Sequence, residues 1–178
     1  MEECVRRLKR FHYTLKRLHQ VFNNRISSEP VYELKMAFSL HSHYCAEHVA
    51  ALRKRIGEMR EPPLGLDTLP DKHLEVFFDE ILAAPTTGEL LLGVYEVALP
   101  ALRDALRQPL ADTNPLADHP SVRLIRFALL EINEMIALGQ ATIDELVDEK
   151  QRAEAQSWLG LLNQCLTKAG VLDGTAEP

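Results

Sequence analysis

Cysteine, glycine and tryptophan are scarce in this chain of 178 residues, which has 3 Cys, 8 Gly and 1 Trp. The three cysteines, Cys4, Cys45 and Cys165, lack the spacing of a metal finger, and their odd number suits a reducing compartment. So few glycines, with long stretches free of proline, favour helices. No segment alternates apolar and polar residues as a half-buried strand would. These absences predict an all-α protein located in the cytoplasm.

Several classes of function lack their sequence motifs. The chain has no glycine-rich phosphate loop, GxSxG, CxxC or HExxH, so nucleotide binding and hydrolysis have no motif to support them. No apolar run approaches the ~20 residues of a membrane span, and the charged N-terminus is unlike a signal peptide. A net charge of −6 argues against nucleic acid as a partner. The locally basic first 25 residues are interpreted as a solvated helix surface.

What the chain does contain is a series of amphipathic segments separated by prolines and turn formers. They suit a single helical bundle domain over residues 1–170, followed by a flexible tail over 171–178. Pro100 is expected to kink one of the helices, because it has no backbone N–H to donate. The expected helices span about residues 2–23, 29–59, 71–84, 87–107, 120–146 and 149–168, with loops over 60–70 and 108–120.

Two histidines lie on the inner face of the second expected helix. At ~100° per residue, His41, Cys45 and His48 share the apolar sector of this helix, while Glu33 lies at its rim. His43 points elsewhere. A buried imidazole needs hydrogen-bond partners, because an unpaired polar group in a dry interior costs ~1–3 kcal/mol. The pattern therefore predicts a polar site in the core.

Other helices offer partners for these histidines. In the helix expected over 120–146, Glu131 falls within the apolar stripe. A turn near residue 26 or 27 would place His12 of the first helix opposite His41. His41 and His48 are ~10.5 Å apart along their helix, so a single metal ion can take only one of them. The predicted metal ligands are Glu33, His41, His48 and Glu131, with His12 and Tyr44 as secondary candidates.

The same residues also fit a purely structural role. An inward histidine in a helical bundle is more often a hydrogen-bonded core residue than a metal ligand. Cys45 is most simply a small buried hydrophobe. Glu131 could pair with a core histidine and fix the helix register without any chemistry. Both interpretations remain open at this point.

Two segments of the chain, HSHYCAEHVAAL at 41–52 and NPLADHPSVRLIRFALLEINEMIALG at 114–139, resemble the ferritin-like helical-bundle superfamily, in particular its uncharacterised bacterial members. The resemblance covers about residues 30–140. It implies a ferritin-like four-helix-bundle core with additional N-terminal and short helices, and a metal-dependent oxidase, oxygenase or ion-handling role. The Glu-x-x-His pattern of di-iron members is missing. Three residues after Glu131, where the pattern has a histidine, the chain has Glu134. An altered or mononuclear site is therefore expected instead of a full di-iron centre.

We therefore expect a metal-binding ferritin-like protein with iron or manganese as cofactor, no organic cofactor, and oxidoreductase activity on a small-molecule substrate. The alternative is a non-catalytic helical scaffold or protein-interaction domain with a degenerate metal site, acting as a homodimer. A third hypothesis is an organic-ligand pocket in a heme-oxygenase-like bundle. Neither nucleic acid nor a membrane is expected as a partner.

Overall fold

The computed structural model describes residues 2–59, 66, 68–112 and 118–175, which form helices and turns with no strand among them. The predicted all-α class is confirmed. Parts of the two predicted loops, 60–65, 67 and 113–117, lie outside the described residues. None of the described helices is both long enough and apolar enough to cross a membrane. In chain order the elements are α1 (Glu2–Ile26), α2 (Tyr32–Glu58), α3 (Lys72–Leu82), α4 (Thr87–Leu91), the π-helix η2 (Leu92–Ala98), α5 (Leu99–Asp112), α6 (His119–Leu146) and α7 (Glu149–Lys168).

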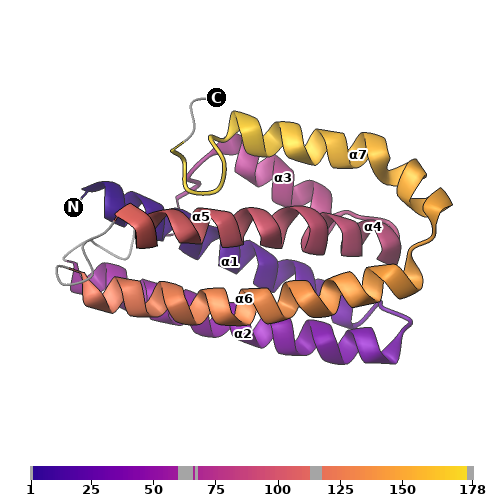
Figure 1. The fold of residues 1–178 in the computed structure, drawn as a ribbon, viewed down its shortest axis with the longest axis horizontal. Coiled ribbons are helices and arrows are strands. Elements are labelled where there is room, and N and C mark those ends of the chain that lie inside the picture. The colour runs from indigo at the N-terminus through magenta and orange to yellow at the C-terminus, as the bar shows by residue number, and fades with distance from the viewer. Residues whose placement is uncertain (1, 60–65, 67, 113–117, 176–178) are drawn as a thin grey trace.

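The helices are stacked as three layers of pairs (Figure 1). The central layer is formed by α1 and by the continuous run of α4, η2 and α5. One outer layer, α2 and α6, packs on it from one side, and the other, α3 and α7, packs from the opposite side. The hydrophobic core lies between these layers, and it includes fully buried phenylalanines from α1, α2 and α3. The first helix is therefore central to the bundle, and the ferritin-like arrangement of the core stays a prediction.

The turn between the first two helices lies later in the chain than predicted. α1 continues to Ile26 instead of ending near Asn23, because Phe22 is fully buried and holds its last turns against the core. α2 begins only at Tyr32. Asparagine has a modest helix propensity, and the packing of its neighbours overrides it here.

This later turn changes which residues of the two helices face each other. Phe22 of α1 packs on His41, with ring centroids 5.4 Å apart, and the imidazole Nδ1 of His19 lies 2.9 Å from the Ser42 hydroxyl. His41 therefore lies opposite the last turns of α1. The predicted placement of His12 opposite His41 was wrong, because Phe22 and His12 are ten residues apart in the sequence, or ~15 Å along the helix.

The basic residues of α1 are used inside the molecule. Arg10 is buried and donates to three backbone carbonyls of the turn after α7, those of Ala169, Val171 and Leu172, at 2.7 to 3.0 Å. Arg17 pairs with Asp79 of α3. The prediction of a solvated basic surface was therefore wrong for these arginines, because their charges satisfy groups of α3 and of the C-terminal turn.

The segment predicted as a tail begins with a packed turn. Gly170 ends α7 with a positive φ of 71°, a conformation that costs glycine little. Leu172 and Asp173 are then buried beside Arg10. Within the predicted tail, residues 176–178 lie outside the described residues.

The fourth expected helix is continuous but irregular. It runs from Thr87 to Asp112 without a break and contains the π-helical segment η2, which ends two residues before Pro100. Pro100 cannot donate to the carbonyl four residues before it, which lies inside this segment. A kink was predicted at Pro100, and what the structure shows is a π-helical segment on its N-terminal side. The helix also continues past the predicted end near residue 107 and includes Pro109.

Candidate functional site

The inner face of α2 carries the predicted polar residues, and the first of them, His41, is enclosed in the core. Its Nδ1 lies 2.7 Å from the hydroxyl of Tyr95, and the side chain is 2 % exposed. Burial lowers the pKa of His41 to about 4. A neutral imidazole can accept a hydrogen bond from the phenol O–H group. The two buried side chains thus serve as each other's hydrogen-bond partners and join α2 to η2.

Tyr95 reaches His41 because of two local features. It lies in the middle of η2, where the wider π-helical turns change the direction of side chains relative to a regular α-helix. α6 then passes directly over its ring at Gly139, where an added Cβ would lie 2.6 Å from the Cβ of Tyr95 and closer still to the ring. The inner glycine of α6 thus permits a close approach of two helices.

One turn further along α2, Cys45 is 1 % exposed. Burial raises the pKa of its thiol, and the negative charge of Glu131 acts in the same direction. The thiol is therefore protonated, whereas a metal ligand would be a thiolate. Cys45 fits the description of a small buried hydrophobe.

His48 and Glu131 are brought together, as the inward positions of both residues suggested. The Nε2–H group of His48 donates to Oε2 of Glu131 at 2.6 Å, and this contact joins α2 to α6. The side chains are 12 % and 32 % exposed, so the pair lies at the edge of the core where solvent can reach it. Of the predicted ligand set, this is the pair that the structure places in contact.

Glu33 and His41 do not join that pair. Glu33 is exposed in the first turn of α2, eight residues before His41, which is ~12 Å along a helix. In the parts of the chain that the structure describes, no group of three or more His, Cys, Asp or Glu side chains is placed to hold a metal ion. Tyr44 packs at the margin of the core, and its ring lies beside that of His43. The assignment of Glu33, His41, His48 and Glu131 as ligands stays a prediction.

Sequence reasoning missed two features of this region. The first is the role of Tyr95 as the partner of His41, which depends on the register between α2 and η2. The second feature is a set of large apolar side chains that the structure leaves exposed on α2 and α6. The sequence contained a signal for it, because LIRFALLEINEMIAL in α6 has more apolar residues than a single inward stripe requires.

No family model matches this chain, and no match was found among curated proteins or solved structures.

Proposed function

We propose that this protein is a non-catalytic helical interaction domain that pairs with a second copy of itself through the outer surface of the α2–α6 layer. We call this surface the α2–α6 face. It consists of exposed residues that recur every three, four or seven positions, so that each helix contributes one stripe. The residues are Glu33, Met36, Leu40, Glu47 and Lys54 of α2, and Arg123, Phe127, Leu130, Glu134, Leu138 and Glu145 of α6.

The observation that carries the proposal is the set of large apolar side chains exposed along this face. Phe127 and Leu130 of α6 are 51 % and 58 % exposed, and Met36 and Leu40 of α2 are 56 % and 46 % exposed. Single exposed apolar residues are normal, but a group on two adjacent helices is typical of an interaction surface. The two helices are antiparallel neighbours, since Arg55 late in α2 bonds Ser121 early in α6.

The charges at the two ends of the face favour a second copy as the occupant. Lys54 and Arg123 line one shallow hollow between the helices at the first end. Glu33 and Glu145 lie at the other end, because α2 begins where α6 finishes. In a symmetric dimer whose two-fold axis is perpendicular to these helices, the helices of the two copies run antiparallel across the contact, so the basic end of one copy faces the acidic end of the other. The two ends of the face are therefore complementary in charge in this arrangement, and Glu47 and Glu134 lie between them.

The contacts inside the bundle support an interaction role over catalysis. His41 is closed by Tyr95, and the Cys45 thiol is protonated and buried. The basic first helix was the other candidate for contacting a partner. Its Arg10 and Arg17 instead bind groups of the same chain. On the α2–α6 face the guanidinium of Arg123 lies 5.0 Å from the centre of the Phe127 ring, and Leu130, Met36 and Leu40 are exposed.

Replacing Leu130 with glutamate is expected to dissociate the dimer. The change removes an apolar side chain from the centre of the contact and adds a charge in each of two copies, so we expect a cost of ~3–6 kcal/mol, or more than a hundredfold in Kd. The measurement is the molar mass in solution by light scattering, with circular dichroism to verify the helical fold.

The matched control is Leu161→Glu, because Leu161 of α7 is 40 % exposed on the opposite outer layer. This variant is expected to keep the mass of the wild type. The proposal is wrong if the Leu130 variant also keeps the dimer mass, or if both variants dissociate equally.

A second candidate function, binding of iron or manganese, is supported by the contact between His48 and Glu131. Imidazole and carboxylate are suitable ligands for these ions, and the pair is reachable from solvent. If the pair holds a metal, protein from metal-supplemented medium contains one ion per chain by elemental analysis, and a His48→Ala variant loses at least ~90 % of it. Metal content near zero in both proteins, with only a lower melting temperature for the variant, would establish a structural role for the pair.

A further inference from the structure

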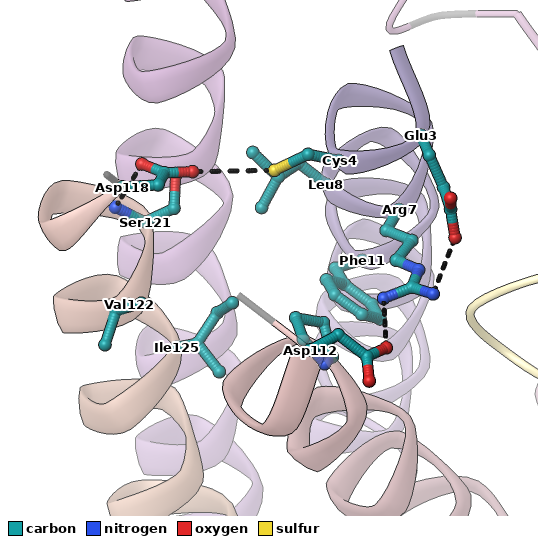
Figure 2. Close-up of a pocket in the computed structure, with 11 residues that line it drawn as sticks. Glu3, Cys4, Arg7, Leu8, Phe11, Asp112, Asp118, Ser121, Val122 and Ile125 are labelled. Atoms are coloured by element: carbon teal, nitrogen blue, oxygen red, sulfur yellow. Dashed lines mark hydrogen bonds and ion pairs between the residues drawn. The ribbon is translucent and has the colours of Figure 1, made fainter. Parts of the chain in front are cut away.

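A cavity opens at the end of the bundle where α1 begins, α5 ends and α6 begins. Its volume is about 410 Å³, which is within the range of small-molecule sites. Figure 2 shows that its walls come from these three helices, with polar side chains around the rim and apolar side chains between them. The lining residues are Glu3, Cys4, Arg7, Leu8, Phe11, Pro109, Asp112, Asp118, Ser121, Val122 and Ile125.

Asp118 supplies the best-placed acceptor of this cavity. Its Oδ1 accepts hydrogen bonds from Nη2 of Arg55 at 2.8 Å and from the backbone N–H of Ser121 at 3.3 Å. Its Oδ2 accepts from the thiol of Cys4 across the cavity at 3.5 Å, which is a weak bond (Figure 2). One oxygen of a carboxylate that is 14 % exposed therefore remains able to accept a stronger donor.

The ionisation state of these two groups is defined by their surroundings. Burial alone would raise the pKa of Asp118, but the hydrogen bonds from Ser121 and the charge of Arg55 outweigh it and lower the pKa. Burial and the neighbouring Asp118 raise the pKa of the Cys4 thiol. The cavity therefore presents a carboxylate opposite a neutral thiol, and the thiol can be displaced as a donor at little cost.

The charge of the lining is negative. Among the described residues, Glu3, Asp112 and Asp118 contribute three carboxylates, against the guanidinium of Arg7 in the lining and that of Arg55, which pairs with Asp118. Arg7 already donates to Glu3 at 2.6 Å and to Asp112 at 3.1 Å, so its N–H groups are directed at carboxylates of the same rim. An anionic ligand would meet the remaining negative charge, whereas a cation would be attracted.

Apolar side chains form the rest of the wall. Leu8 and Phe11 of α1 face Val122 and Ile125 of α6 across the cavity. Pro109 of α5 also lines it. This surface suits a hydrocarbon group of a ligand and not a bare inorganic ion.

We propose that this cavity binds a small organic ammonium ion, a primary amine carried on a short hydrocarbon chain. The ammonium group donates to Oδ2 of Asp118, and the hydrocarbon chain lies against Leu8, Phe11, Val122 and Ile125. This site is separate from the α2–α6 face, and the proposal does not depend on self-association.

The test is a titration of the full chain, followed by the NMR signals of individual amides, with n-hexylammonium as the probe. n-Hexanol and hexanoate, which have the same chain length, serve as the neutral and anionic controls. We expect saturable shifts at cavity residues and a Kd for the ammonium ion at least ~10-fold lower than that for the alcohol, because a charge-assisted hydrogen bond replaces a neutral one.

Asp118→Asn should remove this preference while keeping a side-chain oxygen to cap α6. The ratio of the two Kd values is then expected to fall to near 1, whereas the control Asp144→Asn, on the exposed part of α6, keeps the wild-type ratio. Equal affinity of the wild type for ammonium, alcohol and carboxylate, or the absence of saturable shifts at the cavity, overturns the proposal. If the Asp118 variant does not fold, Ile125→Phe, which fills the apolar wall, is expected to weaken hexylammonium binding at least ~10-fold, and unchanged binding by that variant also overturns it.

Discussion

Replacing Gly139 with alanine is expected to lower the free energy of unfolding by ~2–3 kcal/mol, although alanine is the better helix former by ~1 kcal/mol. The reason is the close approach of α6 to η2. An added Cβ at this position would overlap the Cβ and ring of Tyr95, which is 1 % exposed and enclosed by the His41 and Phe22 rings. Urea denaturation followed by circular dichroism measures the change.

Gly160→Ala is the matched control for this experiment. Gly160 lies inside α7, and an added Cβ would find no atom within 4 Å. We expect this variant to be up to ~1 kcal/mol more stable than the wild type. A second comparison places Gly139→Ala in a Tyr95→Ala background, where the added methyl group has space and should cost less than ~1 kcal/mol. Equal costs in both backgrounds would contradict the assigned contact.

Acid is expected to destabilise the protein through His41. The pKa of this buried imidazole is about 4 in the folded protein, and an unfolded histidine has a pKa near ~6.5. As the pH falls below ~6.5, this histidine binds a proton in the unfolded chain but not yet in the folded protein. The stability therefore decreases with falling pH until about pH 4. The expected loss is ~3 kcal/mol over this range. Urea denaturation at several pH values measures it.

A His41→Leu, Tyr95→Phe double variant isolates this contribution. Both partners of the hydrogen bond are removed together, so that no buried polar group is left unpaired. We expect the double variant to lack the ~3 kcal/mol component of the acid sensitivity, while its other titrating groups remain. Should the double variant and the wild type lose stability in parallel between pH 6.5 and 4, the enclosure of His41 is not the cause.

Angular periodicity predicted correctly which residues of α2 point into the core. His41, Cys45 and the leucines and phenylalanine of the same sector are buried, and His43 is exposed. This succeeded because a regular helix fixes side-chain directions within one element. The capping residue Asp118 of α6 and the span of α7 were also readable from sequence, since both depend on local chemistry.

The contacts between helices could not be predicted in the same way. The partner of His41 depends on the length of the α1–α2 turn, on the π-helical turns around Tyr95 and on the glycine at 139, and none of these follows from propensity. By contrast, the contact of His48 with Glu131 followed from the inward position of both residues, and the structure confirms that they meet. Glu33 and His41 lie about two turns apart on the same helix, and the ligand set of Glu33, His41, His48 and Glu131 stays a prediction.

The exposed stripe on α6 shows a different limit of sequence reasoning. Phe127 and Leu130 belong to a strongly apolar segment, and periodicity alone places them outside the core stripe without saying what covers them. Because α2 and α6 are neighbours, Phe127 and Leu130 share an outer layer with Met36 and Leu40, which are exposed nearer the start of α2. The proposed self-association follows from that surface and from the opposite charges at its ends.

The most direct test of the proposed self-association is the molar mass of the wild-type chain in solution, measured by light scattering over a range of protein and salt concentrations. We expect a mass twice that of one chain, which falls towards that of one chain on dilution. We also expect a weaker association at high salt, because salt screens the charged ends of the α2–α6 face. A mass equal to one chain at every concentration up to the solubility limit would contradict it.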